Sequence, residues 1–241
     1  MALDDGVIKE LCARFERATG INLHETPIEI SRAGKGLRLE GEVESIIMKR
    51  LAVRIAGELA GADAVDDRLT VVPSERREDG AIRDAIEKGF LSEPVFKESS
   101  LYVWNKGKWE TLREVTGRSD GRVEITIEDG TVTLAGEVVS LSHRRMASLL
   151  AWWVRGSRNV VDLIRVTPEE RDNDQEITDA VRLALDKDPL VHSDQIKVTT
   201  RSGNVLLEGL VAQDVEKKSA EYDVWYLTGV SEVTNNIEVG R

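Results

Sequence analysis

The densest group of side chains suited to binding lies in SLYVWNKGKWETL, residues 100–112. This stretch places Tyr102, Trp104 and Trp109 within eight positions, with Lys106 and Lys108 between the tryptophans, in a chain that is only 5% aromatic. Tryptophan and tyrosine are favoured anchors at binding surfaces, and lysine attracts anionic groups. We therefore predict that these five residues contact an anionic phospholipid surface or a protein partner. The alternative is that the aromatic side chains pack structurally against their own domain or a neighbouring one.

Basic residues recur in pairs along this acidic chain. Each pair lies twelve and eleven residues before a glycine, and the three pairs are Lys49-Arg50, Arg144-Arg145 and Lys217-Lys218. Such pairs could form local cationic spots suited to anionic headgroups, or they could lie on a solvated helix face beside acidic residues. We include Arg144 and Arg145 among the candidate contacts because they belong to the same part of the chain as the aromatic stretch.

The remaining reactive side chains show no arrangement suited to catalysis or metal binding. The sequence lacks HExxH and CxxC motifs, and its three histidines form no cluster with ligand spacing. The segment GKG at Gly34–Gly36 lacks the surrounding residues of a phosphate-binding loop. The lone Cys12 excludes an intrachain disulfide framework. We therefore predict a protein that is not an enzyme and that has neither a metal nor a cofactor.

Composition narrows the class of protein further. With 241 residues, 41% of them hydrophobic, the chain has ample material for packed cores. A net charge of −11 argues against nonspecific nucleic-acid binding, which needs a basic face. The start MALDDGVIKE lacks the basic and apolar regions of a signal peptide. The chain as it stands is expected in the cytoplasm, or in the periplasm or envelope if a leader was removed.

Three internal repeats organise the sequence. The related stretches LRLEGEVES, VTLAGEVVS and VLLEGLVAQ each contain a glycine that is followed, twenty residues later, by another: Gly41 and Gly61, Gly136 and Gly156, Gly209 and Gly229. Apolar residues recur at further fixed offsets after each second glycine, so chance matching is excluded. We interpret the six glycines as structural residues of one module that is present three times.

Hydrophobic periodicity assigns the elements of each module. A helix with an apolar stripe precedes two strands with alternating apolar residues, and a second helix and a last strand follow. The predicted fold is α+β, with two helices packed on one face of a three-stranded mixed sheet. The pattern does not show whether the third strand lies beside the first or the second. The predicted repeats are residues 1–73, 78–168 and 173–241.

The second repeat carries an insertion between its first helix and its first strand. About 22 extra residues, roughly 97–120, include LYVW, NKGK and WETL, which are typical of two strands around a glycine-containing turn. The candidate aromatic residues therefore lie on an inserted hairpin. Two further aromatic pairs, Trp152-Trp153 and Trp225-Tyr226, hold aligned positions on the second helices. Adjacent helical positions face different directions, so we expect one member of each pair in the core and the other at an inter-domain or oligomer contact.

These motifs resemble the BON domain, the bacterial osmotically-inducible-protein and nodulation family. The third repeat shows the resemblance best, in DAVRLALDKDPLVHSDQIKVTTRSGNVLLEGLV and LTGVSEVTNNIEV, and the first shows it more loosely. The resemblance implies three tandem binding modules, often in the cell envelope, with phospholipid surfaces, small ions or other proteins as ligands. It implies no catalysis.

The residues and the resemblance together predict a noncatalytic binding or scaffold protein related to stress or the envelope. Two alternatives remain open: a soluble sensor that binds a small ion or metabolite between modules, and a structural subunit of an oligomer.

Overall fold

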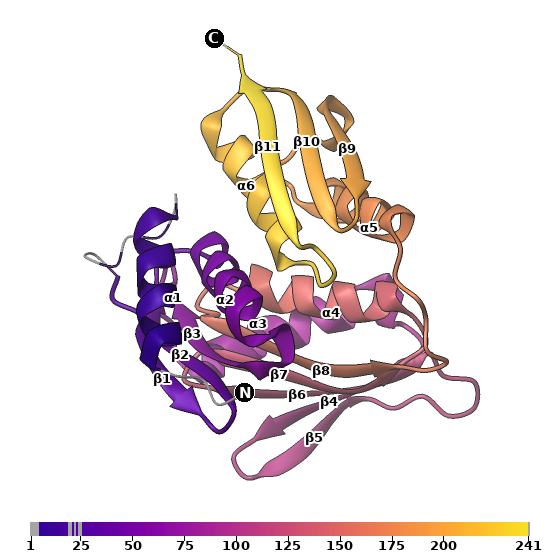
Figure 1. The fold of residues 1–241 in the computed structure, drawn as a ribbon. Helices are drawn as coiled ribbons and strands as arrows, with labels where there is room; N and C mark the ends of the chain where they lie inside the picture. The colour runs from indigo at the N-terminus through magenta and orange to yellow at the C-terminus, as the bar shows by residue number, and fades with distance from the viewer. Residues whose placement is uncertain (1–4, 19–20, 22, 24–25, 241) are drawn as a thin grey trace. The chain divides into compact units, whose positions relative to one another are not determined.

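The computed structural model describes residues 5–18, 21, 23 and 26–240. The chain divides into two compact units, Met1–Pro73 and Ser74–Arg241. The structure has the predicted α+β class, with helices packed on mixed sheets (Figure 1). Each unit is described by itself below.

The first unit contains one copy of the repeated module. Its elements are α1 (Asp5–Arg17), β1 (Glu29–Ala33), β2 (Gly36–Val43), α2 (Ile46–Ala60), η1 (Ala62–Ala64) and β3 (Val65–Val71). The sheet order is β1-β2-β3, with β1 and β2 antiparallel and β2 and β3 parallel. The apolar stripe of α1, including Leu11 and Phe15, packs with Leu37, Leu39 and Leu69 of the strands. The third strand thus lies beside the second.

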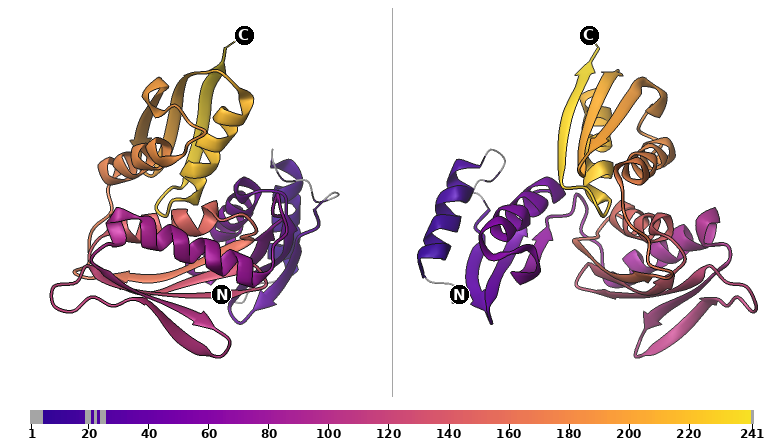
Figure 2. Two further views of the ribbon diagram at one scale, coloured as in Figure 1. Left: turned by 180° about the vertical axis from the view of Figure 1, so that it is seen from behind. Right: turned by 45° about the vertical axis from the view of Figure 1, so that its right-hand side comes forward.

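The second unit contains the other two repeats. The second repeat consists of α3 (Asp79–Ser92), η2 (Pro94–Phe96), β4 (Ser99–Asn105), β5 (Lys108–Arg113), β6 (Gly121–Glu128), β7 (Thr131–Val138), α4 (Leu141–Trp153) and β8 (Asn159–Val166). The third consists of α5 (Asp174–Lys187), η3 (Ser193–Gln195), β9 (Ile196–Arg201), β10 (Asn204–Val211), α6 (Asp214–Tyr226) and β11 (Glu232–Val239). Figures 1 and 2 show two helices on one face of each sheet.

The predicted insertion enlarges the sheet of the second repeat. Strands β4 and β5 form an antiparallel hairpin, and β4 pairs in parallel with β6, which gives the order β5-β4-β6-β7-β8. The third repeat keeps a three-stranded sheet, ordered β11-β10-β9. A continuous apolar cluster runs through both repeats, from Ile82 of α3 to Ile237 of β11. Two copies of the module therefore share one core in this unit.

The glycines Gly41, Gly136 and Gly209 lie close to the backbone at or just before the start of the neighbouring strand. At Gly136 the φ angle is +118°, and a Cβ atom would lie 2.1 Å from the carbonyl oxygen of Arg122 on the paired strand. A Cβ at Gly209 would lie 2.1 Å from the Gln195 oxygen, and one at Gly41 would lie 2.8 Å from the Pro27 oxygen. Non-bonded atoms cannot come this close, so only glycine fits without a shift of the strands. The repeated stretches therefore resemble one another for a steric reason.

Candidate functional site

The inserted hairpin presents two tryptophans to solvent. Trp104 on β4 lies directly opposite Trp109 on β5, with ring centroids 5.3 Å apart and ring planes 70° to one another. The two residues are 41% and 43% exposed. Their neighbours Leu101 and Val103 point to the opposite face of the strand and are fully buried under the helices. Because side chains alternate along a strand, the pattern that buries the leucine and valine places the tryptophans on the uncovered face.

The turn of the hairpin adds positive charge beside the tryptophans. Lys106 and Gly107 have φ angles of +48° and +84°, which make the tight turn, and Lys106 is exposed. The side chain of Lys108 is 72% exposed, with its Nζ 3.7 Å from the Glu110 carboxylate. We call Trp104, Lys106, Lys108 and Trp109 the hairpin tip. Figure 1 shows the β4–β5 hairpin as the outer edge of the five-stranded sheet.

Tyr102 lies on the same face as the hairpin tip but is more enclosed. Its ring lies under the guanidinium of Arg122, with the Arg122 Cζ 4.2 Å from the ring centroid, and Arg122 also pairs with Glu124. Tyr102 is half-buried. The cation–π contact fixes the ring against β6, so Tyr102 supports the hairpin from the side of the sheet.

The first members of two basic pairs, Arg144 and Lys49, form ion pairs within their own repeats. Arg144 donates from Nε to the Asp162 carboxylate at 2.8 Å, and this carboxylate also accepts bonds from Ser148 Oγ and the Ile164 amide. Lys49 occupies the equivalent position in the first repeat and bonds Asp67 at 2.7 Å. Burial lowers the pKa of Lys49, an effect that Asp67 opposes. These pairs tie the second helix to the last strand, so Arg144 and Lys49 have partners inside the chain.

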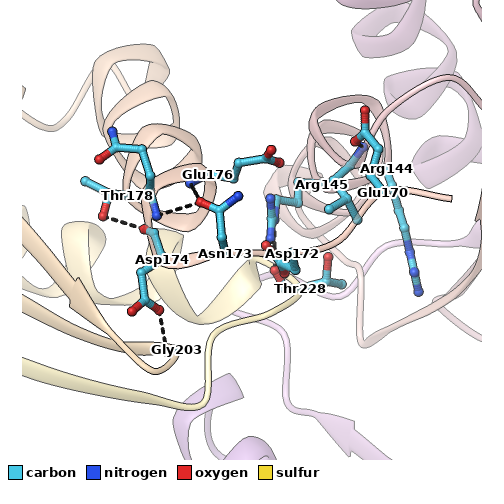
Figure 3. A network of polar contacts seen from close by, with 12 residues as sticks. Arg144, Arg145, Glu170, Asp172, Asn173, Asp174, Glu176, Thr178, Gly203 and Thr228 are labelled. Carbon is cyan, nitrogen blue, oxygen red and sulfur yellow. Dashed lines mark hydrogen bonds and ion pairs between the residues drawn. The ribbon is translucent and has the colours of Figure 1, made fainter.

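Arg145, the second member, is buried where the second repeat meets the third. Only 2% of its surface is exposed. Its Nε donates to the carbonyl oxygen of Thr228 at 3.0 Å, and its Nη2 bonds Asp172. Figure 3 shows Arg145 beside both partners. A direct contact of Arg144 or Arg145 with an external surface stays a prediction, and neither residue belongs to the hairpin tip.

Aromatic side chains join α4 to α6 within the second unit. The rings of Trp152 and Tyr226 stack with centroids 5.3 Å apart and planes 12° to one another. Trp153 donates its indole N–H to Asp223 at 2.7 Å. At the same junction, Lys187 of α5 bonds both oxygens of Glu93 at 3.0 Å. Both Trp152 and Trp153 therefore contact the neighbouring repeat.

Burial at this junction changes two acid–base equilibria. It raises the pKa of Asp223 to about 8, and the nearby Asp188 carboxylate acts in the same direction, while the Trp153 bond acts against it. Burial also raises the pKa of Tyr226, with Asp223 as a further cause. A carboxyl group with so high a pKa is protonated at neutral pH. The sequence pattern did not single out Asp223 because its burial depends on packing between two repeats.

In both repeats of the second unit, an aspartate at the start of the first helix holds a hairpin turn in place. Asp174, the first residue of α5, accepts bonds from the amides of Ser202 and Gly203 at 2.7 and 2.9 Å (Figure 3). Asp79, the first residue of α3, does the same for Asp129 and Gly130. The bonds from Gly203 and Ser202 lower the pKa of Asp174. These carboxylates are structural, because their oxygens are committed to turn amides.

The described residues contain no group of three or more histidine, cysteine, aspartate or glutamate side chains placed to hold a metal ion. None of their helices is long and apolar enough to cross a membrane.

Comparison with known proteins identifies a recurring domain. The family model described as the BON domain matches residues 4–73, 110–168 and 173–241. Two solved structures of CdsD, a structural protein of the type III secretion system of Chlamydia trachomatis, align with the chain. The first, of its C-terminal domain, is 13% identical with a TM-score of 0.26, covering 96% of this chain and 98% of that one. The second is 14% identical with a TM-score of 0.25, covering 96% and 92%.

Proposed function

The chain belongs to the BON domain family, whose members are generally noncatalytic binding modules, and on that premise we propose that it is a noncatalytic binding protein that contacts anionic phospholipid surfaces. The observation that carries this proposal is the hairpin tip, where Trp104 and Trp109 meet edge to face, 41% and 43% exposed, beside two lysines. We further propose that it acts as a scaffold at an envelope membrane, where such lipids are available.

The chemistry of the tip suits a membrane interface better than bulk water. Tryptophan prefers the headgroup region, where its ring is in an apolar layer and its N–H remains hydrated. Each lysine near an anionic leaflet contributes about 1 kcal/mol of attraction. The chain as a whole carries a net charge of −11, which repels such a leaflet. Binding should therefore depend on local contact and weaken with salt, because the Debye length is about 8–10 Å at moderate ionic strength.

A protein partner is the competing occupant of the tip, and the oligomer alternative has less support. Trp152 and Trp225, which were candidates for subunit contacts, are 7% and 6% exposed within the single chain. They are thus largely covered within the second unit, where Trp152 stacks on Tyr226 of the third repeat. Among the described residues, the hairpin tip presents exposed aromatic rings that an external surface could use.

The test is flotation of the full chain with neutral and with anionic liposomes, at low and high salt. We expect binding to anionic vesicles only, weakened by salt, and lost in the double variant Trp104→Ala/Trp109→Ala. Lys108→Glu should weaken it as well. The chain offers a matched control in Lys197→Glu, because Lys197 is also 72% exposed and also lies beside a glutamate, Glu208. Leu163→Ala, at a 59% exposed position on β8, controls for apolar surface.

Two outcomes would contradict the proposal. One is absence of binding to either vesicle at low salt, which would leave a protein partner as the occupant of the tip. The other is equal loss of binding in Lys197→Glu and Lys108→Glu, which would show that attraction depends on overall charge and not on the hairpin.

A further inference from the structure

A cleft lies between the second and third repeats, away from the residues of the hairpin tip. It has a volume of about 280 Å³ and is lined by α4, α5, the segment before α5 and the residue that follows α6. This volume is close to the lower end of ligand pockets, roughly 300–1,000 Å³. Cleft residues come from two repeats, so the site exists only because α4 and α5 pack together.

A buried arginine lines one side of the cleft with an unused donor. Arg145 is 2% exposed, and its Nε and Nη2 are bonded to Thr228 and Asp172. Its Nη1 is buried and has no hydrogen-bond partner among the described residues. Leaving such a donor unsatisfied is unfavourable, and the more so for a charged group. Because Arg145 lines the cleft, an acceptor oxygen bound there could satisfy Nη1 after a small shift of the guanidinium.

Three carboxylates also line the cleft. Glu170, Glu176 and Asp179 all border the cleft, and Figure 3 shows the Glu176 side chain extending from α5 toward the α4 side. Glu170 also accepts the Leu141 amide, and Asp179 accepts the Gln175 amide group. The charge of Arg145 is already matched by Asp172. The cleft as a whole therefore favours a cationic group near Glu176.

Apart from Ser140 and Ser142, the rest of the lining is apolar. Met146 and Leu149 of α4 and Leu227 are 3%, 1% and 3% exposed, and Leu183 of α5 adds a partly exposed side chain. A ligand that matches all three parts needs an acceptor for Arg145, a cation for the carboxylates and a short aliphatic body. We propose that this cleft binds a small aliphatic zwitterion, of the class of the aliphatic amino acids, with its carboxylate at Arg145 and its ammonium group at Glu176.

Calorimetric titration of the full chain with three related compounds tests each part of the recognition. L-leucine carries both charged groups, 3-methylbutylamine carries the ammonium group alone, and 4-methylpentanoate carries the carboxylate alone. We expect saturable binding of leucine, with each single-charge compound about tenfold weaker or more, because each loses a charge-assisted hydrogen bond. L-valine and L-norleucine vary the aliphatic body.

Variants of the lining test where the compound binds. Glu176→Gln should weaken leucine about tenfold, because it removes the charge that faces the ammonium group. Ala180→Leu should abolish binding by filling the cleft, which Ala180 lines. Glu208→Gln, on the uncovered face of β10, is the matched control and should bind like the unmodified protein. Thermal unfolding establishes that each variant is folded.

The outcomes separate this site from the hairpin tip. Trp104→Ala/Trp109→Ala should keep leucine binding, so failure of the membrane proposal leaves this one intact. Absence of saturable binding by all the amino acids would overturn the inference. So would equal affinity for leucine and 3-methylbutylamine, since the arginine would then have no role, or leucine binding that survives Ala180→Leu.

Discussion

At the scale of single residues, Asp223 departs furthest from ordinary chemistry. One oxygen accepts the Trp153 indole N–H at 2.7 Å. The other is buried, lacks a hydrogen-bonding donor among the described residues, and lies near the Asp188 carboxylate. Burial penalises the charged form and is the main reason that the pKa of Asp223 rises from 3.8 to about 8. Asp188 adds to the rise, because two carboxylates can share a hydrogen bond only if one of them is protonated.

The raised pKa predicts a pH-dependent stability of the second unit. In the unfolded chain Asp223 ionises near pH 4, whereas in the folded chain it keeps its proton until about pH 8. The stabilisation is therefore complete below pH 4 and is lost as the pH rises toward 8. The side-chain amide of Asp223→Asn can accept the hydrogen bond from Trp153 and donate one to Asp188 without taking up a proton. We expect it to be more stable than the unmodified protein by about 1–3 kcal/mol at pH 8, with a smaller difference at pH 5.

Denaturant unfolding at the two pH values measures this difference. Asp194→Asn, at an exposed position in the same repeat, is the control and should leave the pH dependence unchanged. Carboxylates with lowered pKa values, such as Asp174, stop stabilising the fold at acid pH in both Asp223→Asn and the unmodified protein. Their effect therefore cancels in the comparison. Equal stability of Asp223→Asn and the unmodified protein at pH 8 would mean that folding does not raise the pKa of Asp223.

At the scale of elements, the sequence predicts the local structure well because local patterns determine it. The order of helices and strands follows from periodicity, and the three BON copies follow from the repeated glycines. The parallel pairing of β4 with β6, which adds the hairpin to the sheet, could not be predicted in this way. Strand pairing depends on contacts between distant residues, and nothing in LYVW or in the following strand specifies the partner. The exposure of the hairpin tip could not be predicted for the same reason.

The repeated glycines offer a prediction at the same scale. Gly136→Ala would place a Cβ atom 2.1 Å from the Arg122 oxygen, so β6 and β7 must move apart. Gly117→Ala is the control, because Gly117 has a similar φ angle of +101° but nothing within 4 Å of its added Cβ. Both variants carry the strain of a positive φ angle. We expect Gly136→Ala to lose at least about 2 kcal/mol more of the unfolding free energy. Equal losses in denaturant titrations would contradict the steric account.

At the scale of the whole molecule, the boundary between the second and third repeats differs from a flexible linker. Polar contacts of Arg145 and Lys187, the Trp152–Tyr226 stack and a continuous apolar cluster cross it. The sequence indicates three copies, but it cannot show that two of them share a core. The extra aromatic residues of the second and third repeats pack at this junction. The first repeat has Gly57 and Glu58 at the aligned positions, so it lacks the side chains that form this stack.

The shared core predicts that the second and third repeats unfold together. We expect amides of the last strands β8 and β11 to exchange with deuterium at similar, slow rates, because both require global unfolding of residues 74–241. Trp152→Ala/Tyr226→Ala removes the stacked pair and should uncouple them, so that one repeat exchanges faster than the other. Trp104→Ala, which removes an exposed ring, should leave the rates equal. Deuterium exchange measured peptide by peptide on the full chain tests this prediction. Different rates for β8 and β11 in the unmodified protein would show that the repeats unfold independently.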